Sequence, residues 1–250
     1  MSIKPWTPTV SRRPGLFHFI VYSFTRGRTE QPEQPEQDSG ETPEESETDA
    51  APSEEEPLMK TVRLPVDFAQ LQAEAPDIYA WLELPDTGID DPVLQRAGAD
   101  LFYNSHNAYG QYYMCGAVFS QSAYNGRNFD SPMTVLYGHS TVLGQPGAFM
   151  ELNNYADEAY FDAHREMRVY MPDGMYVYRI FAACVHSNEH LLYCHDFSDE
   201  AQFDAFFSSL TEDTSPDSHI DAEALPQAGD KVLTLSTCYS ANKNLRYLVM

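Results

Sequence analysis

The end of the chain holds the residues best suited to chemistry. The stretch TLSTCYSANKNLRYLVM (234–250) contains one cysteine, Cys238, and one arginine, Arg246. In the run KVLTLSTC, strand alternation places Cys238 on one face together with Thr234 and Ser236. Position alone favours a buried, unreactive thiol, because free cysteine is among the most buried residue types. A nucleophilic cysteine instead needs a base or a cation beside it.

His139 is the best placed candidate for the base, and Arg246 for the cation. His139 follows NFDSPMTVLYG, so it is expected where a buried strand emerges, although a structural histidine at such a position is common. An arginine within a terminal apolar strand needs a partner for its guanidinium. That partner is either a carboxylate in a salt bridge or the developing negative charge of a reaction, which the fixed fork of N–H groups can bind.

A second group of possible ligands lies in CVHSNEHLLYCH (184–195). Its cysteines and histidines suggest zinc, but their spacing fits no common ligand pattern, and Cys184 and His186 are expected in a strand while the others lie in a loop. We therefore predict no metal and no cofactor. If Cys238 is a free thiol, Cys115, Cys184 and Cys194 allow at most one intrachain disulfide, and their state stays open.

The elements that must position these residues are mainly strands. PDG (172–174) lies between two β-type runs and predicts a hairpin. There is no succession of strand, helix and strand, so a mainly β fold is expected, a barrel or sandwich with short helices at its connections. The predicted strands are 116–120, 133–138, 167–172, 175–185, 231–238 and 245–250.

Helices are expected at the connections. Apolar spacing in PVDFAQLQAEAPDIYAWLEL (65–84) predicts two short helices, and two more are expected between residues 147 and 164. The clearest helix is SDEAQFDAFFSSL (198–210), with Ser198 as the N-cap. Its apolar face consists of Phe203, Phe206, Phe207 and Leu210.

Composition divides the chain into three parts. Residues 30–57 contain twelve acidic residues, five prolines and no lysine, arginine or aromatic residue. Such a stretch cannot bury enough apolar surface to offset its chain entropy, so it is predicted to be a disordered linker before a globular domain at 58–250. The net charge of −23 argues against a nucleic-acid partner, because phosphate binding requires clustered lysine and arginine.

Residues 1–29 form a tail around one apolar run, Leu16 to Phe24, which has arginines on both sides. The run is too short to cross a bilayer, which takes about 20 residues, and no obvious signal-peptide cleavage site follows it. The tail is either an abbreviated membrane anchor or an interfacial or irregular segment. A membrane tether is thus possible.

Together these motifs resemble those of a known family. TLSTC followed by Arg246, with YGH upstream, resembles the sortases, the cysteine transpeptidases of Gram-positive cell surfaces. The stretch VDFAQLQAEAPDIYAWLELPDTGIDDPV (66–93) is similar to the N-terminal part of class B sortases, and the helix at 198–210 is similar to their helical insertion before the cysteine strand. The resemblance covers about residues 64–250.

The resemblance implies a closed β-barrel of seven or eight strands with His139, Cys238 and Arg246 as catalytic residues. It implies cleavage of a sorting-signal peptide after threonine, a thioester acyl-enzyme, and transfer to an amine of cell-wall peptide or of a pilin. The reaction would take place outside the membrane of a Gram-positive bacterium. Ser236 and Thr237 adjoin the nucleophile and are expected to line the substrate groove, or else to hydrogen-bond within the barrel.

Two other functions remain open from the sequence. One is another thiol hydrolase such as a papain-like protease, although those place the cysteine before the histidine and this chain has the reverse order. The other is a surface-binding module without catalytic activity, carried on an acidic stalk. That function predicts an unreactive Cys238.

Overall fold

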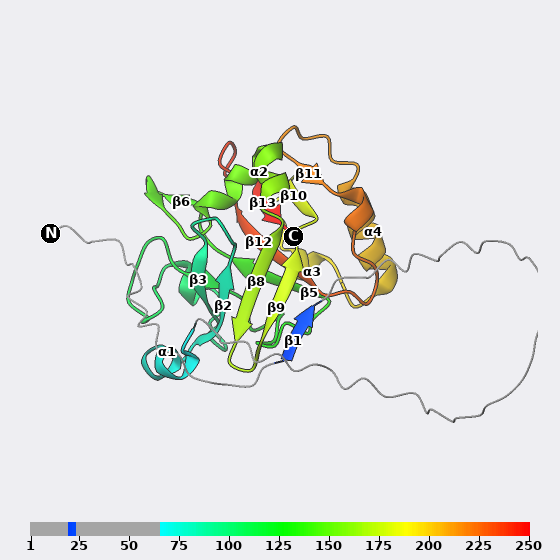
Figure 1. Ribbon diagram of the computed structural model, residues 1–250. Helices are drawn as coiled ribbons and strands as arrows, with labels where there is room; N and C mark the ends of the chain where they lie inside the picture. The colour runs from blue at the N-terminus through cyan, green and yellow to red at the C-terminus, as the bar shows by residue number, and fades with distance from the viewer. Residues whose placement is uncertain (1–19, 24–65) are drawn as a thin grey trace, which may run out of the picture.

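The computed structural model describes residues 20–23 and 66–250, with side chains from residue 66 onward (Figure 1). The predicted linker at 30–57, the predicted domain start at Leu58 and the tail apart from 20–23 lie outside the described residues. Among the described helices, none has both the length and the apolar character needed to span a bilayer.

The fold is mainly β, as predicted. The strands are, in chain order, β1 Ile20–Ser23, β2 Ile78–Glu83, β3 Asp90–Leu94, β4 Val118–Phe119, β5 Met133–Tyr137, β6 Thr141–Val142, β7 Gln145–Pro146, β8 Glu166–Met171, β9 Gly174–Arg179, β10 Ala182–His186, β11 His219–Ile220, β12 Val232–Cys238 and β13 Arg246–Val249. The helices are α1 Phe68–Glu74, η1 Phe102–Asn104, η2 Met150–Ala156, α2 Glu158–Ala163, α3 Leu191–Cys194, α4 Glu200–Leu210 and η3 Ala222–Ala224.

Eleven of the strands form one curled sheet in the order β1-β9-β8-β2-β3-β4-β5-β12-β13-β10-β11, while β6 and β7 form a separate hairpin. The family resemblance implied a closed barrel of seven or eight strands. In the described part of the chain no pairing joins the two ends of this order, so the sheet is open. Among the strands that the sequence did not predict, β1 and β11 have only four and two residues, which is too short to show a period.

The predicted run 175–185 is two strands rather than one. The chain changes partner at Ile180 and Phe181, since β9 pairs with β8 whereas β10 pairs with β13. The predicted hairpin at PDG is confirmed: Met171 pairs with Gly174, which leaves Pro172 and Asp173 as its two-residue turn.

Two helix predictions were wrong in detail. The second helix expected within 65–84 is the strand β2, because both of its faces are buried and a strand covered on both sides loses its period of two. The N-cap of α4 is Asp199, whose side chain accepts a hydrogen bond from the Gln202 backbone N–H, and not Ser198. The hydroxyl of Ser198 donates to Asp196 instead, at 2.5 Å.

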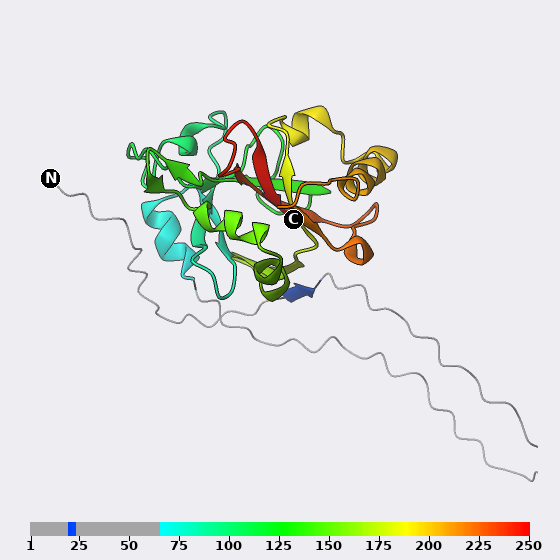
Figure 2. The same ribbon diagram turned by 90° about the horizontal axis from the view of Figure 1, so that it is seen from above.

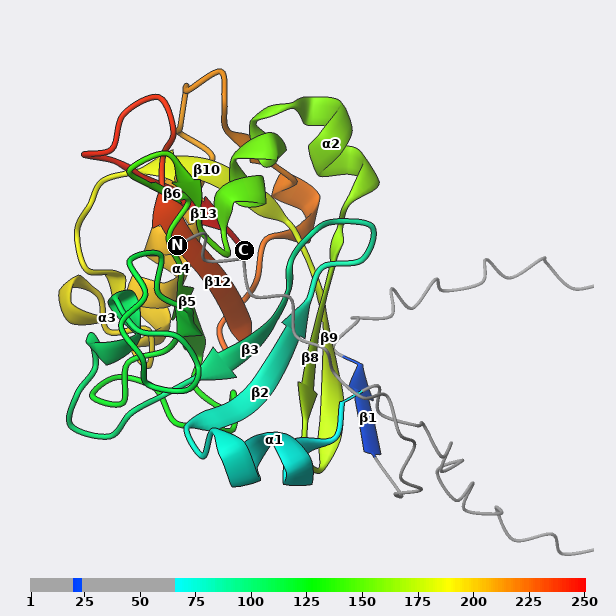
Figure 3. The same cartoon turned by 90° about the vertical axis from the view of Figure 1, so that its left-hand side faces the viewer.

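The core lies within the curl of the sheet and continues on its outer side. Alternation along β12 sends Leu233 and Leu235 into the enclosed core, while Val232 packs outward. There it meets the apolar face of α4, whose four predicted members are all buried. The strand β12 is therefore covered on both faces. Figures 1 and 2 show α4 on the opposite side of the molecule from α1, and Figure 3 shows α1 and α2 at opposite ends of the sheet.

A half-buried carboxyl in β3 makes stability depend on pH. Asp91 pairs with Leu82 of β2, and burial together with the neighbouring charge of Asp90 raises the pKa of Asp91 to about 7. The folded protein thus keeps this proton over a range in which the unfolded chain, with its ordinary value of 3.8, has lost it. Folding is weakened as pH rises through this range, and the loss is complete above about pH 7.

Asp91→Asn should therefore stabilise the protein more at pH 8 than at pH 4. Urea unfolding of both proteins at the two pH values measures this difference, with the exposed Asp204→Asn as the control. An equal change at both pH values would contradict the expected role of this carboxyl.

Candidate active site

Three strand ends bring the predicted catalytic residues to one edge of the sheet. The strand β12 pairs antiparallel with β13, and this register sets Cys238 directly opposite Arg246. On its other side β12 pairs parallel with β5, where Ser236 lies opposite Tyr137. His139 comes two residues after the end of β5 and so emerges at the same edge as Cys238.

The guanidinium of Arg246 lies next to the sulfur of Cys238. Its Nη1 donates to Cys238 Sγ at 3.7 Å and to the backbone oxygen of Leu245 at 3.3 Å. Among the described residues no carboxylate forms an ion pair with Arg246, and its guanidinium bonds to the sulfur and to this carbonyl oxygen instead. The salt bridge that the sequence left open as an alternative is therefore not formed there.

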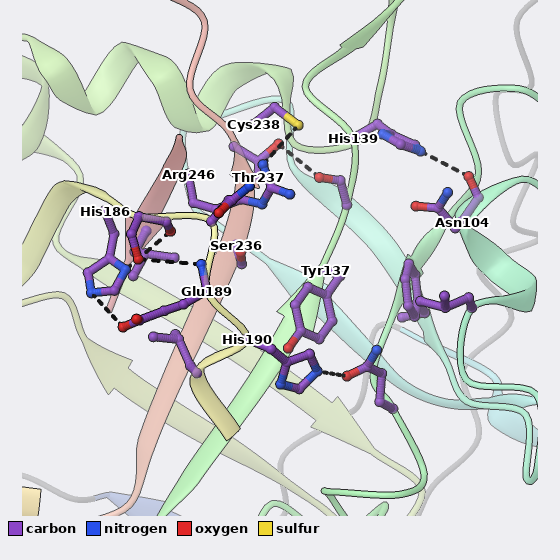
Figure 4. Close-up of a pocket in the computed structure, with 18 residues that line it drawn as sticks. Asn104, Tyr137, His139, His186, Glu189, His190, Ser236, Thr237, Cys238 and Arg246 are labelled. Carbon is purple, nitrogen blue, oxygen red and sulfur yellow. Dashed lines mark hydrogen bonds and ion pairs between the residues drawn. The ribbon is translucent and has the colours of Figure 1, made fainter. Parts of the chain in front are cut away.

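His139 lines the same cleft, but its hydrogen bond is to another segment. Its Nε2 lies 2.9 Å from the backbone oxygen of Asn104 in η1. A carbonyl oxygen can only accept, so Nε2 carries the hydrogen in this contact and Nδ1 is left for proton exchange. Figure 4 shows the imidazole turned toward Asn104. The sequence did not point to Asn104, because the group that acts is a backbone atom.

The backbone around His139 is closely packed. The β6–β7 hairpin returns the chain so that Phe149 donates its N–H to the oxygen of His139 at 3.0 Å. A Cβ on Gly147 would lie 2.1 Å from the same oxygen, so this close approach requires glycine. On the side of the nucleophile, Asn153 bonds to the backbone of Cys238 and Ser240. Both chain segments are thus fixed by contacts outside their own strands.

The cleft has a volume of about 250 Å³ and brings together all five predicted site residues. Ser236 and Thr237 both line it, and the Thr237 hydroxyl also donates to the oxygen of Gly138 at 2.8 Å, which joins the ends of β5 and β12. Side chains that the sequence did not assign to the site complete the lining, among them Leu101, Asn104, Phe119, Gln121, Tyr137, Glu189 and His190.

The cysteine- and histidine-containing stretch 184–195 contributes one wall of this cleft. Cys184 is buried in β10, where burial raises the pKa of its thiol to about 12. His186 lies opposite Arg246 in the adjoining strand and 3.8 Å from Glu189. His190 lies 2.6 Å from the Gln121 side-chain oxygen. His186 at the end of β10, with Glu189 and His190 from the loop before α3, lines the cleft, whereas Cys184 does not (Figure 4).

Tyr137 provides an unused polar group in the wall. Its hydroxyl is buried and has no hydrogen-bond partner among the described residues. Burial, together with nearby Tyr124, raises the pKa of Tyr137, so the group stays a neutral donor at physiological pH. Unpaired buried donors are rare because they are costly. A polar group of a bound molecule would satisfy this one.

Comparison with known proteins places the chain among relatives of one kind. The family model described as the Sortase domain matches residues 82–250. Sortase B of Listeria monocytogenes is 26% identical over 172 residues, which cover 69% of this chain and 67% of the relative. Sortase B of Staphylococcus aureus is 25% identical over 175 residues, covering 70% and 68% of the two chains.

Solved structures agree with this similarity. A Bacillus anthracis protein described as similar to sortase B matches with a TM-score of 0.61 and 26% identity, covering 75% of this chain and 81% of its own. A Streptococcus pyogenes class B sortase, described as involved in pilus biogenesis, matches with a TM-score of 0.59 and 26% identity, covering 74% and 96%.

The site geometry predicts which cysteines react. Iodoacetamide should label Cys238 and the exposed Cys194 in the folded protein, while the buried Cys115 and Cys184 should react at least about tenfold more slowly. Peptide mapping by mass spectrometry measures the four rates, and denatured protein, in which all four should react, is the control. Protection of Cys238 in the folded protein would contradict the accessible nucleophile and favour the non-catalytic alternative.

Proposed function

This chain belongs to the sortase family and is similar to its class B members, and from that premise we propose that it is a transpeptidase for sorting-signal peptides. Sortases are cysteine transpeptidases that act at the Gram-positive cell surface. The observation that carries the proposal is the cleft in which Cys238, Arg246 and His139 meet, with the guanidinium beside the sulfur.

In the proposed first half of the reaction, the Cys238 thiolate attacks the backbone carbonyl carbon of the threonine in the sorting signal. The carbonyl π-electron pair moves to oxygen, and the N–H groups of Arg246 stabilise that oxyanion. As the C–N bond breaks, His139 in its imidazolium form gives its proton to the leaving amine. The products are a thioester on Cys238, a released C-terminal fragment and a neutral imidazole.

In the second half, an amine attacks the thioester carbonyl and His139 removes the proton from the incoming nitrogen. Collapse of the second tetrahedral intermediate breaks the C–S bond and restores the thiolate–imidazolium pair. The acceptor is an amine of cell-wall peptide or of a pilin. Water in place of the amine gives slow hydrolysis as a side reaction.

The guanidinium has a role before the substrate reacts as well. For a free thiol and a free imidazole in water, ordinary pKa values of about 8.5 and about 6.5 make the ion pair about a hundredfold less populated than the neutral pair. Each tenfold gain in that population requires about 1.4 kcal/mol. A permanent cation beside a sulfur favours the thiolate, so Arg246 would assist both nucleophile formation and oxyanion binding.

The rest of the chain fits this activity. Ser236, Thr237 and Tyr137 line the cleft and would offer polar contacts to a peptide backbone. We further propose that residues 30–57, which lie outside the described residues, link the domain to a membrane tether.

Product analysis tests the reaction type. With a library of threonine-containing sorting peptides, the wild type should give a product joined to an added amine, and Cys238→Ala should give none. Mass spectrometry with and without the amine distinguishes the alternatives. Hydrolysis alone, unaffected by amine, would indicate another thiol hydrolase, and no turnover of any peptide would leave only the binding module.

Arg246→Lys tests the role of the guanidinium. Lysine keeps the charge but loses the planar fork of donors, so kcat/KM for peptide cleavage should fall by about a hundredfold. Arg179→Lys is the matched control. Arg179 is an exposed arginine at the end of β9 that pairs with Asp221, so this variant should keep near-normal rates. Near-normal rates for Arg246→Lys would refute the assigned role.

A further inference from the structure

The backbone carbonyl of Asn104, which bonds to His139, belongs to a short turn with little internal stability. The turn η1 (Phe102–Asn104) has three residues, and its N-cap Leu101 makes no side-chain capping hydrogen bond. Turns of this length have poor hydrogen-bond geometry and little helical cooperativity. The position of the Asn104 oxygen must therefore be set by contacts from other elements.

Tyr103 connects this turn to Asp77. Its side chain is buried, and its hydroxyl donates to Asp77 Oδ2 at 2.6 Å. Asp77 directly precedes β2, and its backbone oxygen accepts from the Gln95 N–H at 3.0 Å, so it belongs to the body of the β2–β3 pair. Hydrogen bonds to a carboxylate are stronger than neutral ones. The turn is thereby joined to a rigid part of the sheet.

Arg96 joins the same carboxylate to Phe102, the first residue of the turn. Its Nε donates to Asp77 Oδ2 at 2.8 Å, and its guanidinium carbon lies 3.7 Å from the centre of the Phe102 ring. Burial alone would raise the pKa of Asp77, but hydrogen bonds from Tyr103 and Arg96, with the nearby charge of Arg127, outweigh it and lower the pKa. The carboxylate is thus ionised at neutral pH and holds both residues.

We propose that Asp77 is a positioning residue for His139, acting through Tyr103, Arg96 and the backbone oxygen of Asn104. A fixed acceptor at Asn104 keeps the hydrogen of the neutral imidazole on Nε2, which leaves Nδ1 for proton transfer in the cleft. When the turn is loosened, the ring turns and the two tautomers mix. The consequence for turnover rests on the proposed transpeptidase function, whereas the consequence for the tautomer does not.

The chain contains a matched control for this test. Tyr103→Phe removes only the hydroxyl that bonds to Asp77. Tyr170→Phe removes an equivalent hydroxyl on β8, which donates to Glu83, a carboxylate that also lies 3.8 Å from Arg168. Tyr103 and Tyr170 belong to the same hydrophobic cluster. The two variants should therefore lose similar stability, measured as the melting temperature.

The first readout is nitrogen-15 NMR of the histidine rings, with the His139 signals identified by their loss in His139→Gln. Wild type and Tyr170→Phe should show His139 with the hydrogen on Nε2 at high pH, and Tyr103→Phe should show a mixture of tautomers. The second readout is peptide cleavage. Tyr103→Phe and Asp77→Asn should lower kcat by about tenfold, with KM changed less than about twofold, because a misplaced proton donor affects the transition state and not binding.

A wild-type tautomer in Tyr103→Phe, or an equal loss of kcat in Tyr103→Phe and Tyr170→Phe, would overturn the inference. Should Tyr103→Phe fail to fold, Arg96→Lys takes its place, since it keeps a cation beside Asp77 and loses the planar contact with Phe102; it should shift the tautomer in the same direction. Absence of a transpeptidation product from the wild type would refute the proposed function, and the NMR comparison would still decide the positioning role.

Discussion

The antiparallel pairing of β12 with β13 is the interaction on which the site depends. Side chains directly opposite each other in such a pair have Cβ atoms about 5 Å apart. At this separation the long side chain of Arg246 can bring its guanidinium to the sulfur of Cys238. The register sets Cys238 against Arg246, and a shift by one residue would send one of them to the other face of the sheet. Both strands are largely buried, so their apolar residues fix that register.

The remaining parts of the site are joined to this pair in different ways. The parallel pairing of β5 with β12 brings His139 to the same edge, but the direction of its ring is decided by the oxygen of Asn104 in η1. The opposite wall comes from the loop between β10 and α3, whose Glu189 and His190 face the cleft. The cleft is therefore assembled from segments that are distant in sequence.

This arrangement explains how much the sequence could predict. The helical period correctly grouped the apolar face of α4, because that face meets a single apolar environment. The strand β2 was misread as a helix, since it is buried on both faces and its apolar spacing fits either structure. The motifs identified Cys238, His139 and Arg246, and the structure places all three in one cleft.

The missed residues show what a sequence leaves out. Tyr137 is the tyrosine of YGH, yet the neighbouring sequence does not indicate that its hydroxyl lacks a partner among the residues that the structure describes. Gln121 and Glu189 reach the cleft only through the tertiary fold. Asn104 takes part through its backbone, so no residue type could have revealed it. The closed barrel was expected from resemblance, and strand pairing can be known only from the folded chain.

The location of Arg246 has a consequence for the energetics of catalysis. It begins a strand that lies between β12 and β10, so its backbone is held on both sides before any peptide arrives. A cation carried on a mobile loop would have to be ordered in every turnover, at a cost in conformational entropy. Here that ordering is completed once, when the protein folds, and the charge already stands where the oxyanion would form.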